Sequence, residues 1–508
     1  PLLLLAGSSH RDQVGMGAFQ ELNQVEVCRP FTKYAAQPFN IPQIPHIIER
    51  AYHHTLQGRP GAAYVDLPAD FINGQCDPAS VDFASCRAAL PLEVSADEHH
   101  IKLAASLLCA AKKPLIVIGK GAAYARAESE VRELVNLTGI PFLPTPMGKG
   151  VVPDDDMRCA SAARSLVLKE SDVILVLGAR LNWILHFGLP PRFRADVKII
   201  HVDVCAEELG RTRHIDVPVV GHLRPVLRNL IAMLRTLPAL PTPSSEYTDQ
   251  LRAKVQANEL AAAKRLDDGK LPLSYHHTFK VIRSLLPSNV LLVSEGAKTM
   301  DISRSIFTMQ EPRTRLDAAT SGAMGPALGY AIAAQLLHPD RRVAAVLGDS
   351  AFGFSAMELE TAARHKLPLI VVVINNNGIY AGLKADTFAS LETPLALPPS
   401  TLLPNARYEM MAEAFGGRGF LCRTGPEVEA AVRDALAFQG GISVINILID
   451  TGDPTQELVS GPPLLFAPCA KYSHLLPVGI WLDEQGPKRD SLVVLLCYLL
   501  STLAHSTQ

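Results

Sequence analysis

Oxygen-bearing groups follow two apolar runs in the second half of the chain. Asp349 comes directly after the run 343–347, while Asn376 and Gly378 follow the run 369–374. Apolar runs of this length predict buried strands, and the carboxyl ends of parallel strands meet at one edge of a sheet. A carboxylate, an amide and a glycine carbonyl suit a hard cation such as Mg²⁺, which fills its other positions with phosphate or water.

The residues between these strands predict a crossover helix and an anion site. Ser355 and Glu358 have the spacing of a capping box, so we expect the helix to begin near Ser355. The helix N-terminus and the backbone amides of Ser350 and Ala351 favour an anion beside the cation. The sequence therefore predicts a diphosphate bridged to the protein by a metal.

The spacing of the two ligands is more specific than either residue alone. Taken singly, Asp349 or Asn376 is equally well explained as a turn former at a strand end. Asn376, however, follows Asp349 by 27 positions, and both lie in short motifs, GDS and NNNG. This pattern resembles the thiamin diphosphate signature, which implies thiamin diphosphate and Mg²⁺ as cofactors.

Length and composition limit the function classes. At 508 residues the chain is long enough for about three domains of roughly 150 residues. A formal charge of −2 argues against a nucleic-acid binder, which needs a basic patch to neutralise phosphates. Nine scattered cysteines without a CxxC pair predict free thiols. The apolar run 492–504 is shorter than the roughly 20 residues of a spanning helix, so we expect no membrane span.

Strand and helix patterns alternate along most of the chain, which is typical of α/β domains with doubly wound parallel sheets. We expect three such domains, at 1–90, 95–235 and 273–450, with the first one incomplete. Residues 236–272 are a Pro-rich and then charged linker, and 451–508 are a poorly ordered tail. A capping box of Ser95 and Glu98 opens the second domain. The predicted strands are 2–5, 62–65, 115–118, 173–177, 197–202, 290–293, 343–347, 369–374 and 444–449, and a helix is predicted at 44–52.

Two glycine-containing turns are further candidates for the cofactor site. Residues 322–325, GAMG, precede a helix that Pro326 opens, since proline suits the first helical position. Gly296 and Ala297 follow the predicted strand 290–293, and their backbone amides can bind a diphosphate. A plain helix entry and a plain strand-end turn explain these segments equally well from local sequence.

A nucleotide site is predicted in the second domain. Residues 119–124 occupy the place of a dinucleotide fingerprint, but Tyr124 replaces the third glycine, so NAD is not predicted. Lys120, Arg180 and Asp203 suit phosphates near the cations and ribose hydroxyls near the carboxylate. Surface charges unrelated to any ligand are the alternative. The sixteen histidines show no metal spacing, and the pairs at 53–54 and 99–100 are interpreted as structural.

Taken together, motifs over residues 1 to about 450 closely resemble the 2-hydroxyacyl-CoA lyase family, which is related to oxalyl-CoA decarboxylase and acetolactate synthase. The motifs are GAFQE (17–21), GRPGAAYVDLPADF (58–71), GKGAAYA (119–125), PTPMGKGVVPD (144–154), GARLNWILHFGLPP (178–191), SEGAKTMD (294–301), GDSAFGFSAMELET (348–361) and NNNGIY (375–380). The resemblance implies a partial pyrimidine-binding domain, a central domain that binds the ADP part of CoA, and a diphosphate-binding domain.

The resemblance also implies site residues. Gly322 and Met324 match the turn that holds the aminopyrimidine ring, and Ile379 joins the cofactor-binding residues. Gln20 and Tyr380 are the residues placed to hydrogen-bond the reacting groups, and Phe19 would form a wall of the pocket.

The implied reaction cleaves 2-hydroxyacyl-CoA, with Mg²⁺ and thiamin diphosphate, to formyl-CoA and an aldehyde in fatty acid alpha-oxidation. The implied assembly is a homodimer or homotetramer. The implied location is the peroxisome, although the final residues, His505 to Gln508, are no SKL-type signal, which leaves the cytoplasm as an alternative.

Departures from the family pattern lead to three further expectations. The family's activating glutamate has no counterpart in this chain, because Glu21 and Glu26 do not occupy its motif. We therefore expect turnover at least about a hundredfold slower than that of a full-length homologue, and an exposed strand edge at 2–5. Lys298 and Pro326 also differ in type from the family, and Lys298 either pairs with the diphosphate or faces solvent. The rival functions are a flavin-containing acetolactate synthase-like carboligase and a catalytically inactive partner of a full-length lyase.

Overall fold

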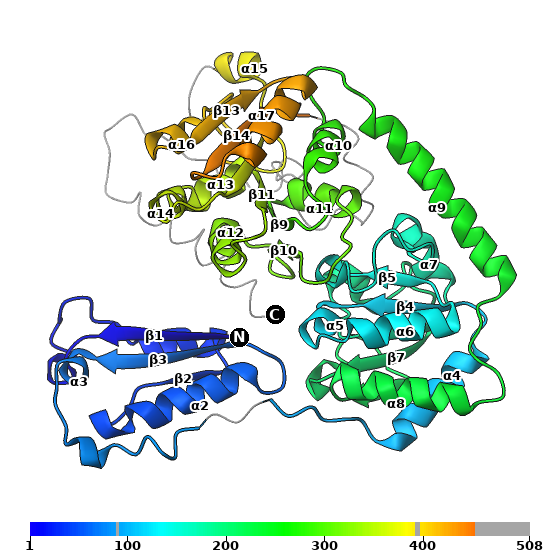
Figure 1. Ribbon diagram of the computed structural model, residues 1–508, viewed down its shortest axis with the longest axis horizontal. Coiled ribbons are helices and arrows are strands. Elements are labelled where there is room, and N and C mark those ends of the chain that lie inside the picture. The colour runs from blue at the N-terminus through cyan, green and yellow to red at the C-terminus, as the bar shows by residue number, and fades with distance from the viewer. Residues whose placement is uncertain (88–90, 392–396, 453–508) are drawn as a thin grey trace, which may run out of the picture. The chain divides into compact units, whose positions relative to one another are not determined.

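The computed structural model describes residues 1–87, 91–391 and 397–452, and Figure 1 shows their helices and strands. Three parallel sheets follow one another along the chain. The expected α/β class with parallel sheets is therefore confirmed. The predicted tail lies outside the described residues from position 453 onward.

The first sheet has three strands in the order β1-β3-β2. Its core is small and joins Ile47 and Ala51 of one helix to Ala63 and Val65 of the central strand. The outer strand exposes Leu2, Leu4 and Leu5, with Leu2 60% exposed, whereas Leu3 packs against the core, so the predicted exposed strand edge is present. The elements are β1 (Leu2–Ser8), α1 (Gln24–Cys28), β2 (Tyr34–Ala36), α2 (Ile44–Leu56), β3 (Ala62–Pro68) and α3 (Ala69–Ile72).

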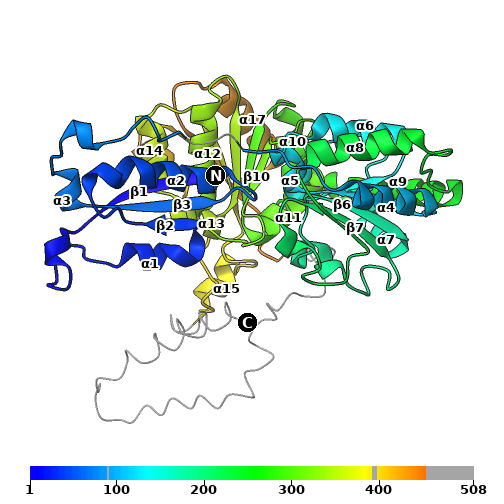
Figure 2. The ribbon, with the colours of Figure 1, turned by 90° about the horizontal axis from the view of Figure 1, so that it is seen from below.

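The second sheet has five strands in the order β5-β4-β6-β7-β8 and helices on both faces. Ile116 and Ile118 point into the core formed with α4, α6 and α8, whereas Leu115 and Val117 point into the core formed with α7 and α9. Figure 2 shows α6 and α8 on one side of this sheet and α7 on the other. The elements are α4 (Glu98–Ala110), β4 (Pro114–Ile118), α5 (Lys120–Tyr124), α6 (Glu128–Thr138), β5 (Phe142–Pro144), α7 (Arg164–Glu170), β6 (Val173–Leu177), β7 (Lys198–Asp203), β8 (Val217–Val220), α8 (Leu223–Thr236) and α9 (Ser245–Leu266).

The third sheet has six strands in the order β10-β9-β11-β12-β14-β13. Strand β11 lies between β9 and β12, so the loops that follow these three strands are neighbours. Separate apolar cores cover its two faces. The elements are α10 (Tyr275–Leu285), β9 (Leu291–Glu295), α11 (Ala297–Ile306), β10 (Arg315–Asp317), α12 (Pro326–Leu337), β11 (Val343–Gly348), α13 (Asp349–Ser355), α14 (Glu358–Arg364), β12 (Ile370–Asn375), α15 (Ala385–Ala389), α16 (Met410–Ala414), β13 (Arg418–Cys422), α17 (Gly425–Ala437) and β14 (Ser443–Leu448).

Both predicted capping boxes are wrong. Helix α4 begins after Asp97, whose carboxylate accepts the backbone N–H of His100, so Ser95 does not cap it. The crossover after β11 begins at Asp349 itself, and Met357, without a side-chain cap, precedes the second helical segment. Ser and Glu at this spacing also occur where another residue begins the helix, so the pattern alone does not locate a helix start.

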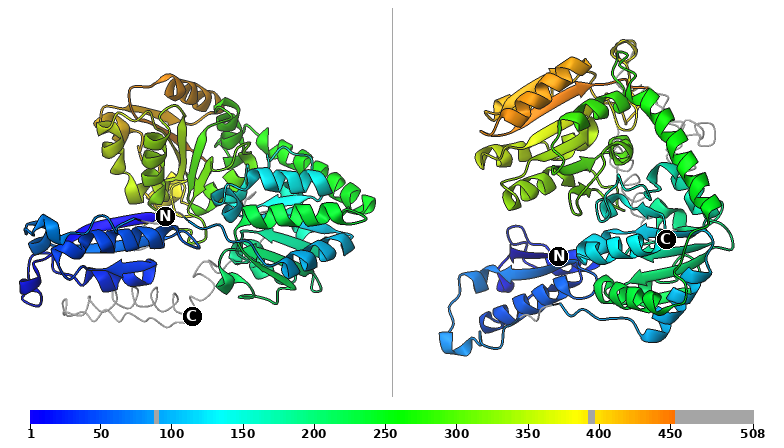
Figure 3. Two further views of the ribbon diagram at one scale, coloured as in Figure 1. Left: turned by 60° about the horizontal axis from the view of Figure 1, so that its bottom comes forward. Right: turned by 45° about the vertical axis from the view of Figure 1, so that its right-hand side comes forward.

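The predicted linker contains the longest of the described helices. Helix α9 has 22 residues, and Ser244 caps it by accepting the N–H of Tyr247. It is visible in Figure 3 as the long green helix. Only Tyr247 and Leu251 of α9 are buried. None of the described helices is both long enough and apolar enough to cross a membrane.

Close backbone packing at the carboxyl edge of the second sheet requires glycine. A Cβ atom at Gly119 would lie 2.0 Å from the carbonyl oxygen of Gly178. We expect Gly119→Ala to lower the free energy of unfolding by about 3 kcal/mol or more, because backbone atoms cannot move aside as a side chain can. Gly329→Ala is the matched control, since no atom lies within 4 Å of its added Cβ. Inside α12 that control should be neutral or stabilise by about 0.5–1 kcal/mol. Thermal unfolding of both variants tests this, and equal melting temperatures would contradict it.

Candidate active site

The Asp349 carboxylate connects the ends of two neighbouring strands. Asp349 follows β11 and is 1% exposed. One carboxylate oxygen accepts the N–H of Ser350 at 2.7 Å, and the other accepts the N–H of Gly378, beyond β12, at 3.0 Å. The structure thus brings together two of the three predicted metal ligands, as their places at adjacent strand ends led us to expect.

Asn376 lies in the same turn and is also buried. Its side-chain nitrogen donates to the carbonyl oxygen of Tyr380 at 3.2 Å, so the amide oxygen, on the other branch, is the atom suited to a metal. Gly378 contacts Asp349 through its N–H, whereas the predicted ligand is its carbonyl oxygen. Asn377 and Tyr380 have left-handed backbone conformations, with φ of 63° and 68°, which make this turn tight.

Burial raises the pKa of the Asp349 carboxyl to about 6, although hydrogen bonds from nearby backbone amides oppose the rise. The described residues place no cationic side chain within ion-pair distance of this carboxylate. Burial and the charge of Asp349 together raise the pKa of Tyr408 to about 12. A buried carboxylate beside an amide oxygen suits a divalent cation, which would supply the missing positive charge.

No cluster of three or more His, Cys, Asp or Glu side chains suited to a metal occurs among the described residues. The predicted Mg²⁺ site would not form such a cluster, because Asp349 is its single carboxylate and its other ligands are an amide and a backbone carbonyl.

The predicted diphosphate loop after β9 packs against the start of the Asp349 loop. Gly296 has φ of 95°, and a Cβ atom there would lie 3.2 Å from the backbone nitrogen of Gly348. Helix α11 begins at Ala297, directly after this glycine. The hydroxyl of Ser350 also contacts the sulfur of Met324, at 3.7 Å. The predicted cofactor residues Gly296, Ala297, Ser350 and Met324 therefore belong to segments that contact one another.

The turn 322–325 leads into α12 as predicted, with Pro326 at its first position. Gly322 has φ of 58° and donates its N–H to the carbonyl oxygen of Ala318 at 3.2 Å. Sequence reasoning missed the partner of this turn, the carboxylate of Glu295 at the end of β9. It accepts the N–H groups of Gly325 and Ala327. No local pattern connects residues 30 or more positions apart, so only the structure reveals this contact.

Tyr380 lies beneath Lys298, whose ammonium group is 3.9 Å from the centre of the tyrosine ring. This cation–π contact joins Lys298, next to the predicted diphosphate loop 296–297, to Tyr380 in the turn after β12. The Tyr380 side chain is 62% exposed, and Ile379 is 41% exposed. Both side chains therefore remain accessible to a ligand, as their predicted roles require.

Gln20 and Phe19 lie in the connection between β1 and α1, and both are exposed. No hydrogen bond among the described residues joins either of them to the Asp349 loop. Glu21 in the same connection accepts three backbone N–H groups, from Gly15, Gly17 and Ala18, and is thus part of the loop structure. These bonds hold the pKa of the Glu21 carboxyl below its usual value.

The three predicted nucleotide-binding residues lie at one edge of the second sheet. Lys120 follows β4, Arg180 follows β6 and Asp203 ends β7, and these strands are adjacent. Lys120 lies over the ring of Tyr124, at 4.8 Å from its centre. One oxygen of the Asp203 carboxylate accepts the N–H of Cys205 at 2.9 Å and lies 3.8 Å from the Arg59 guanidinium. Arg59 is a neighbour that sequence reasoning missed.

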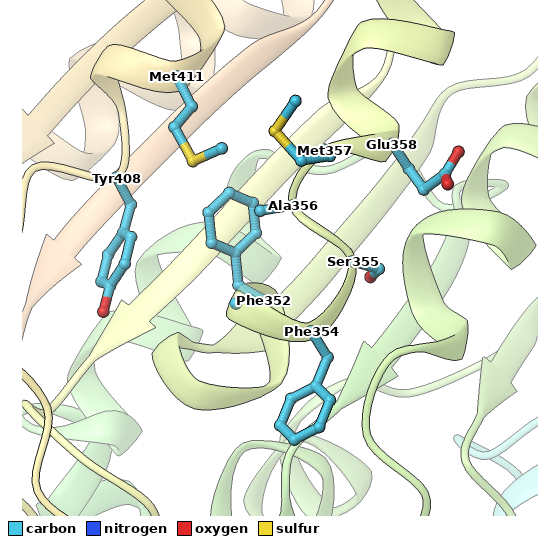
Figure 4. Close-up of a pocket in the computed structure, with 9 residues that line it drawn as sticks. Phe352, Phe354, Ser355, Ala356, Met357, Glu358, Tyr408 and Met411 are labelled. Atoms are coloured by element: carbon cyan, nitrogen blue, oxygen red, sulfur yellow. The ribbon is translucent and has the colours of Figure 1, made fainter.

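An apolar cavity lies beside α13 and is not lined by the predicted ligands. Figure 4 shows Phe352 and Met411 facing one another across it, while Phe354 points away. Tyr408 lines the same cavity and packs edge-on against Phe352, with 5.6 Å between ring centres. None of the predicted site residues lines this cavity, so it belongs to the packing around the Asp349 loop.

Comparisons with known proteins define the class. Residues 101–230 match the family "Thiamine pyrophosphate enzyme, central domain", and residues 295–447 match "Thiamine pyrophosphate enzyme, C-terminal TPP binding domain". The fold is similar to that of benzoylformate decarboxylase from Polynucleobacter necessarius, with a TM-score of 0.70 and 20% identity, covering 89% of this chain and 82% of that one. The chain is a thiamine pyrophosphate enzyme.

Curated relatives define the family within this class. 2-hydroxyacyl-CoA lyase 1 of Mus musculus is 47% identical over 458 residues, which cover 89% of this chain and 79% of that protein. The lyase of Saccharomyces cerevisiae is 38% identical over 90% of this chain and 82% of its own length. Oxalyl-CoA decarboxylase of Escherichia coli K12 is 37% identical over 90% of this chain and 80% of its own length. The chain belongs to the 2-hydroxyacyl-CoA lyase family, as the motifs predict.

Asp349 leads to a prediction about stability in the absence of metal and cofactor. The folded-state pKa of about 6 lies above the ordinary 3.8. The protonated carboxyl therefore contributes fully to the free energy of unfolding below pH of about 4. This contribution, on the order of 3 kcal/mol, is lost as the pH rises through about 6.

Asp349→Asn cannot ionise and should not show this loss. Melting temperatures of variant and wild type between pH of about 4.5 and 7.5 test the prediction, since the difference should grow in favour of the variant as the pH rises. Parallel pH profiles would contradict it.

Proposed function

We propose that this chain is a thiamin diphosphate- and Mg²⁺-dependent carbon–carbon lyase that acts on 2-hydroxyacyl-CoA. The bond between C1 and C2 breaks, the 2-hydroxyl loses its proton to leave an aldehyde, and C1 takes up a proton and leaves as formyl-CoA. Family membership supports the reaction class. We further propose that the reaction serves fatty acid alpha-oxidation in the peroxisome, and that the enzyme is a homodimer or homotetramer.

The observation that carries the proposal is the buried Asp349 carboxylate, to which, in the part of the chain that the structure describes, backbone amides donate without a cationic side chain. Asp349, Asn376 and the Gly378 carbonyl would hold Mg²⁺. The backbone amides of Gly296, Ala297 and Ala351 would bind the diphosphate, and Ser350, whose N–H is donated to Asp349, would contribute its hydroxyl. Gly322, Met324 and Ile379 would hold the aminopyrimidine ring. When bound, thiamin diphosphate supplies a carbon nucleophile and an electron sink that amino-acid side chains lack.

The substrate would contact two groups of residues. Lys120 and Arg180 would bind the phosphates of CoA, and Asp203 would accept hydrogen bonds from its ribose. Tyr380 and Gln20 would hydrogen-bond the hydroxyl and thioester oxygens at the reacting end. The Lys298 ammonium is attracted to the face of the Tyr380 ring, and this contact would fix the orientation of the ring.

Removing the Asp349 carboxylate tests the proposal directly. Asp349→Ala should weaken Mg²⁺-dependent binding of thiamin diphosphate at least about a hundredfold, since loss of a buried charge partner costs about 3 kcal/mol or more. Calorimetric titration measures this binding, and formyl-CoA release from a 2-hydroxyacyl-CoA should be lost in parallel. Asp340→Ala, in an exposed turn, is the control. Unchanged thiamin diphosphate affinity of Asp349→Ala would remove Asp349 from the metal site.

The two ligands should be separable by mutation. Lys120→Ala and Arg180→Ala should each weaken acyl-CoA binding about tenfold, the effect of one accessible charged contact to a phosphate. Thiamin diphosphate affinity should stay unchanged in both variants. Lys112→Ala, an exposed lysine at the other edge of the same sheet, controls for the loss of positive charge. Equal loss of both ligands would instead assign Lys120 and Arg180 to the fold.

A further inference from the structure

Glu295 is a buried carboxylate that the proposed reaction leaves without a role. It ends β9, is 1% exposed, and pairs in register with Leu347 of the strand that leads to Asp349. One of its oxygens accepts the N–H of Gly325, and the other accepts the N–H of Ala327 at 2.6 Å. No lysine, arginine or histidine among the described residues forms an ion pair with it.

The two N–H groups bonded to Glu295 belong to the first turn of α12. Pro326 lies between them and has no N–H of its own, so Gly325 and Ala327 supply the amides at this end of the helix. A neutral cap would satisfy these amides without burying a charge. A buried carboxylate reaching over from another strand is costly unless both of its oxygens are bonded. Both are bonded here, which holds the turn to the end of β9.

The position of Glu295 in the chain connects two predicted parts of the cofactor site. Gly296 and Ala297, which follow it directly, are the predicted diphosphate residues. Gly322 and Met324, which precede its two bonding partners, are the predicted ring-binding residues. Gly296 also packs against Gly348, so the Glu295 end of the arrangement is fixed to the Asp349 loop.

We propose that Glu295 is a positioning residue that fixes the ring-binding turn 322–325 relative to the diphosphate loop 296–297. The proposal rests on the proposed function, because it assigns both segments to one cofactor. Glu295 would act through the backbone amides of Gly325 and Ala327, to which its two oxygens are bonded, and not through a contact of its own with metal or cofactor. Its effect should therefore appear only for a ligand that reaches both segments at once.

Glu295→Gln tests the proposal, because the glutamine amide nitrogen cannot accept a backbone N–H. The probes are thiamin diphosphate with Mg²⁺, which reaches both segments, and inorganic pyrophosphate with Mg²⁺, which reaches only the diphosphate loop. We expect about a tenfold loss of thiamin diphosphate affinity from one missing charged hydrogen bond. Pyrophosphate affinity should stay within about twofold of wild type, because pyrophosphate does not reach the turn that the lost hydrogen bond holds. Glu360→Gln, at a half-exposed glutamate of α14 that pairs with Arg364, is the matched control.

Other outcomes overturn the proposal. Equal losses for both probes, or no loss for either, would make Glu295 a purely structural cap. Wild-type protein that binds pyrophosphate but not thiamin diphosphate would instead refute the proposed function, and the positioning role with it.

If Glu295→Gln does not fold, Glu295→Asp replaces it, because the shorter carboxylate keeps its charge but cannot reach both amides. The same difference between the two probes is expected, with thiamin diphosphate affinity lowered and pyrophosphate affinity unchanged. Equal losses for both probes, or no loss for either, would overturn the positioning role.

Discussion

Burial of the Asp349 carboxyl at the end of β11 constrains the surrounding loops. A carboxyl removed from water must accept hydrogen bonds or take up a proton. The amide of Ser350, the next residue in the chain, supplies one hydrogen bond, and the amide of Gly378 supplies the other from a loop beyond β12 that must therefore approach closely. The tight turn at Asn377 and the packing of Gly296 on Gly348 follow from this crowding.

The same burial leaves the charge of the Asp349 carboxylate incompletely compensated. Apolar side chains surround the Asp349 loop, with Phe352 fully buried beneath it. Backbone amides compensate the charge only in part, which leaves the carboxyl pKa raised. A cation would complete the compensation, so folding of this region and cofactor binding are thermodynamically linked. Glu295 repeats the principle nearby, with two amides on one buried carboxylate.

Strands covered on both faces could be predicted because almost every residue in them is apolar. Strands β4 and β12 are buried throughout, and both were found as continuous runs. Strands β5 and β10, with three residues each, are too short to show a pattern. The contact between Asp349 and Gly378 followed from adjacent strand ends. The contact of Glu295 with Ala327 could not be predicted, since it depends on how far a loop folds back.

The roles of individual site residues are harder to predict than the fold. Asp203 has the expected place at a strand end, yet one of its two carboxylate oxygens already accepts the N–H of Cys205 and lies near Arg59. Gln20 lies in an exposed connection without a hydrogen bond to the Asp349 loop among the described residues. Charge type and strand position are local properties of the sequence, whereas competition for a partner depends on neighbours distant in the chain.

The connection between the second and third sheets has a practical consequence for proteolysis. Proteases cut extended chain more readily than helix, because their active sites bind an extended strand. The extended part before α9, 237–244, contains no lysine or arginine, and each of its two leucines is followed by proline. The part after α9 contains Lys270, which is exposed, lies outside any helix and is followed by leucine. Trypsin should therefore cut this connection after Lys270, so that α9 stays with the second sheet.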